Sequence, residues 1–192
     1  PFVLFDRYFE DVKVNHVILD NYTGSYNMTK HLVSKGYKKI AFVTIKSNMN
    51  QMADRQNAYK KALQDAGLAP DEKRILELPF LPVIHEDYDQ LKNFILAQPD
   101  LDAVFFGTNY IGVLGLEVIA DCGITVPNDL AVVSFDDHDL FRLARPPISV
   151  VAQPIEQLAT EAINLLLSII ENKQAPIRQI SIPAKLIIRA SE

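Results

Sequence analysis

Short apolar runs alternate with amphipathic stretches along most of the chain. Runs with the β-branched, apolar character of buried strands lie at 17–20, 38–45, 74–78, 103–107, 129–135 and 148–153. Apolar residues at helical spacing fill the intervals 23–36, 52–67, 86–98 and 109–123. Strand-length runs separated by helices of this length predict parallel βαβ units. We therefore expect an α/β fold with a parallel, Rossmann-like sheet and flanking helices.

The pattern changes after residue 145. A long helix is predicted over 154–173, and it is followed by an extended segment at 179–189. Pro183 falls inside this segment, and proline cannot donate a hydrogen bond to a neighbouring strand. The segment is therefore expected to form two short pieces instead of one central strand.

Composition narrows the class of protein. The 192 residues are 48% hydrophobic, which is enough to bury a substantial core. They carry 19 Lys and Arg against 24 Asp and Glu, a formal charge of −5, so these residues are not expected to hold nucleic acid themselves. The single cysteine, Cys122, excludes a disulfide framework. With neither a membrane-spanning run nor a signal sequence at its start, the chain is expected to be cytoplasmic.

Polar residues lie just after two of the predicted strands and early in the helix that follows a third. Asp136 follows the strand at 130–135, Asn109 follows the strand at 103–106, and Arg55 lies early in the helix after 38–45. Ligands of open parallel sheets bind beyond the carboxyl ends of the strands. Carboxylate, amide and guanidinium groups there suit a neutral polyhydroxylated ligand. Alternatively, Asp136 and Asn109 serve only as N-caps of the helices that follow.

Two other readings of the polar residues find less support. The run Asp136-Asp137-His138-Asp139 offers metal-ligating groups, but adjacent loop residues rarely converge on one ion and no second set follows, so we expect no metal. Ser134 lies within a predicted strand, and no nucleophile–base–acid arrangement is present. We therefore expect neither a cofactor nor an enzymatic activity.

The chain resembles the effector-binding part of the lactose-repressor/galactose-repressor (LacI/GalR) family of bacterial transcription regulators. The resemblance runs nearly from end to end, in order, with family-like spacing. The segments that carry it are FDR at 5–7, HLVSKGYKKIAFV at 31–43, DRQNAYKKAL at 54–63, NYIGVLGLEVIADCGITVPNDLAVVSFDD at 109–137, RPPISVVAQP at 145–154 and LIIRAS at 186–191.

This resemblance implies a type I periplasmic-binding-protein-like fold, with two α/β lobes joined by three crossing segments and an effector in the cleft between them. Residues 20–152 and 181–192 would form the C-terminal lobe, while 1–19 and 153–180 would be remnants of the N-terminal lobe. The implied effector-binding residues are Asp6, Arg55, Phe80, Asn109, Asp136 and Gln153, with Phe80 as an aromatic that packs on a sugar face.

The implied function is that of a sensing domain for a small-molecule effector, expected to be a sugar or sugar derivative. The resemblance also implies a homodimer through the C-terminal lobe, with contacts near 112–122 and 140–150. Operator DNA would be bound only through an N-terminal domain that is absent from these residues. The alternative is a periplasmic sugar-binding protein of a transport system. Tyr110 and Ala58 stand where the family usually has Asp and Gly, so the ligand's identity is left open.

Overall fold

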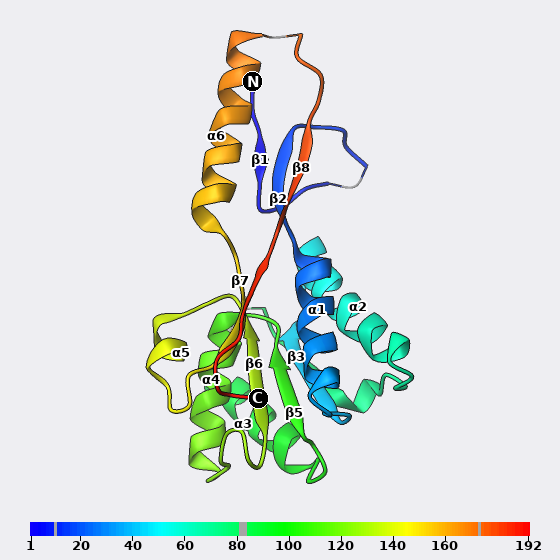
Figure 1. The fold of residues 1–192 in the computed structure, drawn as a ribbon, viewed down its shortest axis with the longest axis vertical. Helices are drawn as coiled ribbons and strands as arrows, with labels where there is room; N and C mark the ends of the chain where they lie inside the picture. Colours follow the sequence, from blue (N-terminus) through cyan, green and yellow to red (C-terminus); the bar gives the residue numbers. More distant parts are fainter. Residues whose placement is uncertain (10, 81–83, 173) are drawn as a thin grey trace.

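The structure is a computed structural model, and it describes residues 1–9, 11–80, 84–172 and 174–192. The described residues form a small sheet and a large sheet at opposite ends of an elongated molecule (Figure 1). The small sheet is parallel, with the order β1-β2-β8. Its strands are β1 (Leu4–Phe5), β2 (His16–Asp20) and β8 (Gln179–Pro183).

The large sheet has the strand order β4-β3-β5-β6-β7-β9. Its strands are β3 (Ile40–Ile45), β4 (Ile75–Leu78), β5 (Ala103–Phe106), β6 (Ala131–Phe135), β7 (Ser149–Ala152) and β9 (Lys185–Ile187). All neighbouring pairs are parallel except β7 and β9, which are antiparallel. The predicted α/β fold with a mostly parallel sheet is confirmed.

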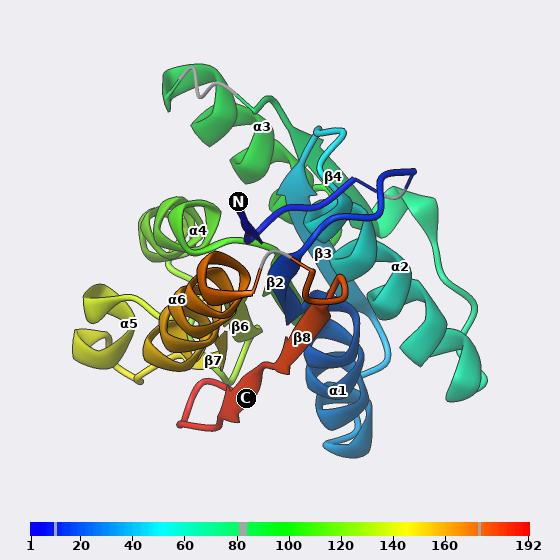
Figure 2. The same ribbon diagram turned by 90° about the horizontal axis from the view of Figure 1, so that it is seen from above.

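Four helices cover the two faces of the large sheet. They are α1 (Asn21–Ser34), α2 (Asn50–Asp65), α3 (Ile84–Leu96) and α4 (Asn109–Asp121). Figure 2 shows α1 and α2 on one side of the strands and α3 and α4 on the other. Three further helical segments are η1 (Glu72–Arg74), α5 (Asp139–Leu143) and α6 (Ile155–Glu171).

The alternation of side chains along the strands divides the core into two clusters. In β3, Ile40 and Phe42 pack with α1 and α2, whereas Ala41 and Val43 pack with α3 and α4. All four are fully buried. A strand covered by helices on both faces needs apolar residues at every position, which explains the continuous apolar runs in the sequence.

Three connections join the small sheet to the large one (Figure 1). The chain passes from β2 to α1, from β7 to α6 and from β8 to β9. As the proline at 183 predicts, the segment 179–189 is divided into two strands, and these belong to different sheets. The lobe boundary predicted at 180/181 falls within β8, because the residues up to Pro183 still pair with β2.

Helix α6 covers one face of the small sheet and leaves much of its own apolar surface open. Leu158 and Leu165 are buried in the same cluster as Val17 of β2, whereas Ile163 is 58% exposed.

Among the described residues, no helix combines the length and apolarity needed to cross a membrane.

Candidate functional site

The carboxyl ends of the parallel strands of the large sheet face the small sheet. The chain leaves the end of β7 directly for α6, which lies beside the small sheet (Figure 1). The same edge carries Gly107 after β5 and Asp136 after β6. This edge is the expected place for a ligand in an open parallel sheet.

Arg55 of α2 points into this edge and is held there by several contacts. Its side chain is almost fully buried, with Nε donating to Asn21 Oδ1 at 2.9 Å and Nη1 donating to the Gly107 carbonyl oxygen at 2.7 Å. The guanidinium carbon lies 3.6 Å from the centre of the Phe135 ring. Burial lowers the pKa of Arg55, and the charge of Asp136 opposes that shift. Because an arginine stays protonated in proteins, the edge holds a fixed positive charge.

Asp136 completes an ion pair with Arg55. Arg55 Nη1 lies 3.4 Å from Asp136 Oδ2, and Gln153 Nε2 donates to Asp136 Oδ1 at 2.5 Å. Gln153 belongs to the connection between β7 and α6. The pair is therefore linked to one of the segments that join the two sheets.

Asp6 and Asp136 share an unusual backbone conformation. Both have φ of 66°, in the left-handed region that residues other than glycine seldom occupy. Such conformations cost on the order of 1–3 kcal/mol and tend to gather at ligand sites. Their occurrence at two of the predicted effector residues supports a binding role for this region.

Neither Asn109 nor Asp136 is the N-cap of a helix, so the capping alternative does not hold. The N-cap of α4 is Thr108, and Asn109 is the first residue of the helix itself. Helix α5 begins at Asp139 after His138, whose ring accepts from the backbone N–H of Leu140. Asp136 is therefore two residues before the cap, and its carboxylate is directed to Arg55 and Gln153 instead.

The four residues of the run Asp136-Asp137-His138-Asp139 make different contacts. Asp136 joins Arg55, whereas Asp137 accepts two hydrogen bonds from the guanidinium of Arg189, at 3.0 and 2.7 Å. His138 caps α5, and Asp139 pairs with Arg142 on the surface. Within the described residues, no three His, Cys, Asp or Glu side chains gather in a way that would hold a metal ion.

Asp6 brings the small sheet into contact with α2. Its backbone N–H donates to Val17 in the small sheet, and its Oδ2 lies 3.4 Å from Gln51 Nε2. Gln51 is buried and precedes Arg55 by one helical turn, so both lie on one face of α2. Gln51 is not among the predicted site residues, although its spacing of four residues from Arg55 is a signal present in the sequence.

The structure does not join Phe80 to the other predicted site residues. Its side chain is 51% exposed, and no aromatic or cation–π contact connects it with the other five in the described part of the chain. Asn109 is half-buried, two residues beyond the Gly107 carbonyl that accepts from Arg55. The geometry thus gathers Arg55, Asp136 and Gln153 by direct bonds, and it places Asn109 and Asp6 near them in the fold.

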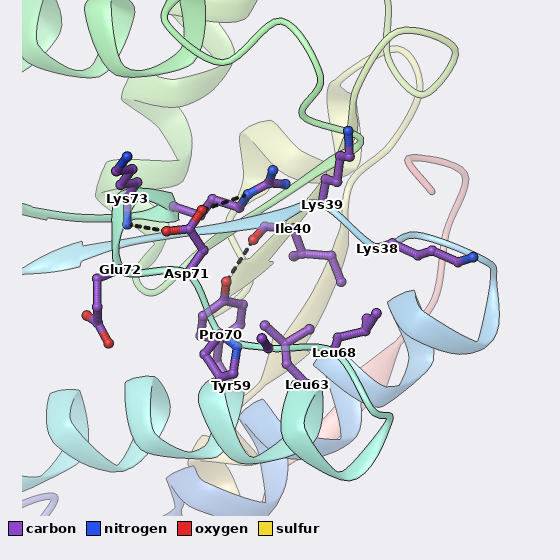
Figure 3. Close-up of a pocket in the computed structure, with 12 residues that line it drawn as sticks. Lys38, Lys39, Ile40, Tyr59, Leu63, Leu68, Pro70, Asp71, Glu72 and Lys73 are labelled. Carbon is purple, nitrogen blue, oxygen red and sulfur yellow. Dashed lines mark hydrogen bonds and ion pairs between the residues drawn. The ribbon is translucent and has the colours of Figure 1, made fainter.

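A cavity of about 670 Å³ lies elsewhere, at the amino end of β3 and beside the loop that follows α2 (Figure 3). Its floor includes Tyr59, whose hydroxyl donates to the Ile40 carbonyl oxygen at 2.7 Å. Both side chains are fully buried in the core, so an occupant would cover little of them. None of the six predicted site residues lines this cavity.

Comparison with known proteins places the chain in a family. A sequence profile of the periplasmic binding protein-like domain matches residues 29–192. A solved LacI-type transcriptional regulator from Bacillus cereus subsp. cytotoxis is 31% identical, with a TM-score of 0.88 over 100% of this chain and 67% of its own. The chain belongs to the LacI/GalR family. Its type I periplasmic-binding-protein-like fold is thereby confirmed.

Two further relatives are similar over nearly the whole chain. The HTH-type transcriptional repressor PurR of Haemophilus influenzae (strain PittEE) is 31% identical over 183 residues, covering 92% of this chain and 54% of its own length. The solved complex of the transcriptional regulator CelR with cellobiose is 28% identical, with a TM-score of 0.90 over 100% of this chain and 59% of its own. The chain thus spans about half the length of the curated relative.

Proposed function

We propose that the chain is the effector-sensing part of a bacterial DNA-binding transcriptional regulator and that it is not an enzyme. The effector is a carbohydrate that binds between the two sheets. The observation that carries this proposal is the Arg55–Asp136 pair, which lies at the carboxyl edge of the large sheet with Gln153 from a connecting segment.

The chemistry of this edge favours a neutral polyhydroxylated ligand. Asp136 accepts from hydroxyl groups, Arg55 donates to hydroxyl oxygens, and the amides of Asn109 and Gln153 do both. The fixed positive charge of Arg55 is balanced by Asp136, so the edge needs no charged ligand to neutralise it. The CelR–cellobiose complex supports a carbohydrate, and cellobiose is therefore our first choice of probe.

The connections between the sheets offer a route from effector to DNA. A ligand that contacts Asp6 on one side and Arg55 on the other would favour one angle between the sheets. In the full-length protein, that angle would set the spacing of two DNA-binding domains in a cytoplasmic dimer. Because coupling between two binding sites is reciprocal, an effector that weakens DNA binding must itself bind less tightly to the DNA-bound form.

The competing proposal is a periplasmic sugar-binding protein of a transport system. The polar groups at the same edge would also suit a transport protein. However, the relatives reported above are regulators, and their similarity extends over nearly the whole of this chain. The reading frame upstream of Pro1 separates the two: a helix-turn-helix domain supports the regulator, and a secretion signal supports the transporter.

A DNA-binding assay tests the regulator directly. We expect the full-length protein to bind its operator in a gel-shift assay and cellobiose to change the fraction bound. Residues 1–192 alone are expected to give no specific shift, since their net charge is −5. Sequence-specific, salt-sensitive binding by these residues alone would contradict the proposed division of roles.

We also expect the chain to self-associate through its large-sheet lobe. Leu143 and Leu140 of α5 are 69% and 48% exposed, and Tyr110 at the start of α4 is 43% exposed. In sedimentation at micromolar concentration, Leu140→Glu/Leu143→Glu is expected to shift the dimer toward monomer. The matched change Ile163→Glu/Ile170→Glu on α6 tests the other exposed apolar surface. A wild-type monomer, or a dimer that only the α6 variant disrupts, would show that this assignment is wrong.

A further inference from the structure

Asn21 stands where the chain leaves the small sheet for the large one. It follows β2 directly and is the first residue of α1, yet it is only 4% exposed. Its Nδ2 donates to the Leu19 carbonyl oxygen at 3.2 Å, and its Oδ1 accepts from Arg55 Nε at 2.9 Å. Both ends of the amide are therefore bonded, one to the strand behind it and one to the buried arginine.

Leu19, whose carbonyl oxygen accepts from Asn21, lies in β2 of the small sheet. Leu19 pairs with Ile182 of β8, so its position follows that of the sheet. Asn21 thus connects a group of the small sheet with a side chain at the edge of the large one. A change in the angle between the sheets would alter one of its two bonds unless the amide moved with it.

The backbone of Arg55 is held separately from its side chain. The hydroxyl of Ser25, one turn along α1, donates to the Arg55 carbonyl oxygen at 2.7 Å in a buried contact. The guanidinium is then oriented at Nε by Asn21 and at Nη1 by the Gly107 carbonyl oxygen. Loss of Asn21 would free one edge of the guanidinium and leave the α1–α2 packing in place.

We infer that Asn21 is a positioning residue, which fixes the orientation of Arg55 and ties it to the first connection between the sheets. This inference rests on the proposed function insofar as Arg55 contacts the effector. The sequence offers only a weak signal for it, a polar residue directly after a predicted strand.

Hydrogen exchange at Arg55 Nε–H tests the inference without any ligand. In the full-length protein labelled with ¹⁵N-arginine, the Nε–H signal is assigned by its loss in Arg55→Lys. We expect Asn21→Ala to speed its exchange by about tenfold, because the amide acceptor of a charged donor is lost. Asn21→Asp keeps an acceptor oxygen and is expected to retain near wild-type exchange. Asn57→Ala, an exposed asparagine on the same helix as Arg55, is the matched control.

The outcomes separate positioning from packing. Wild-type exchange in Asn21→Ala would overturn the inference, and so would equal acceleration in Asn21→Ala and Asn21→Asp, which a packing role predicts. If Asn21→Ala does not fold, Asn21→Ser, whose side chain is too short to reach Arg55, replaces it under the same criteria.

Calorimetric titration with cellobiose then tests the link to binding. We expect weaker binding in Asn21→Ala and recovery in Asn21→Asp. If wild-type protein does not bind cellobiose, the choice of sugar in the proposed function is wrong, and the exchange measurement still decides the role of Asn21. If the exchange result is as expected while all variants bind cellobiose like wild type, Asn21 does not act on binding, and that half of the inference fails.

Discussion

Replacement of Arg55 or Asp136 by alanine is expected to weaken effector binding by about ten- to a hundredfold in the full-length protein. On the proposed function, each substitution removes a charge-assisted hydrogen bond to the effector, which costs roughly 1.5–3 kcal/mol. Isothermal titration with cellobiose measures the effect. Circular dichroism and thermal unfolding establish that the variants remain folded.

The two substitutions differ in what they leave behind. Asp136→Ala leaves Arg55 bonded to Asn21 and to the Gly107 carbonyl oxygen, so its main effect falls on the ligand. Arg55→Ala also opens a space beside Phe135, which the guanidinium covers. Arg55→Met, which keeps most of the volume, separates the lost charge from the lost packing.

A surface pair supplies the matched control for this experiment. Arg142 and Asp139 form an ion pair whose side chains are 59% and 79% exposed. Exposed pairs contribute little, so Arg142→Ala is expected to leave effector affinity unchanged. Wild-type affinity in both Arg55→Ala and Asp136→Ala, with folding intact, would mean that their pairing has only a structural role.

The second large effect is a loss of folding stability, which we expect on substitution of Arg189 near the C-terminal end of the chain. Its guanidinium donates twice to Asp137 and once to the Ile148 carbonyl oxygen, while its backbone N–H donates to Ser149 Oγ. The side chain is only 13% exposed. We expect Arg189→Met to lower the free energy of unfolding by about 2–3 kcal/mol, because a half-buried carboxylate loses its partner. Chemical denaturation at pH 7 measures this difference.

The Arg189 effect should also depend on pH. Burial by itself would raise the pKa of Asp137, but hydrogen bonds from Arg189 and from the backbone N–H of His138 outweigh it and lower that pKa below its ordinary value. The stabilisation is therefore complete above the unfolded-state pKa of about 3.9 and is lost as the pH falls through the lower folded-state pKa. The stability gap between wild type and Arg189→Met is thus expected to narrow below about pH 4.

Arg142→Met provides the control for the pH experiment, since Arg142 is exposed and its contribution is expected to be small. A gap that stays constant as the pH is lowered would show that Arg189 stabilises the fold by packing instead of through its ion pair with Asp137.

Local patterns in the sequence determined the order of the elements. The strand at 40–45 and the helix at 50–65 were both predicted within a few residues, because burial on both faces and helical spacing leave signatures in neighbouring residues. The same patterns placed Asp136 at the end of a strand and Arg55 early in the helix that follows another strand, which was enough to predict a polar site there. The first strand, β1, and the short helix α5 were not predicted, since two and five residues carry too little periodicity.

Tertiary structure alone decided which charges pair. Asp136 and Asp137 are neighbours in the sequence, yet one joins Arg55, 81 residues away, and the other joins Arg189, 52 residues away. Composition and spacing do not distinguish two adjacent aspartates, because their different partners follow from the left-handed backbone at Asp136 and from strand order. The burial of Asn21 against Arg55 likewise depends on α1 and α2 lying side by side, a contact between distant segments that no local pattern encodes.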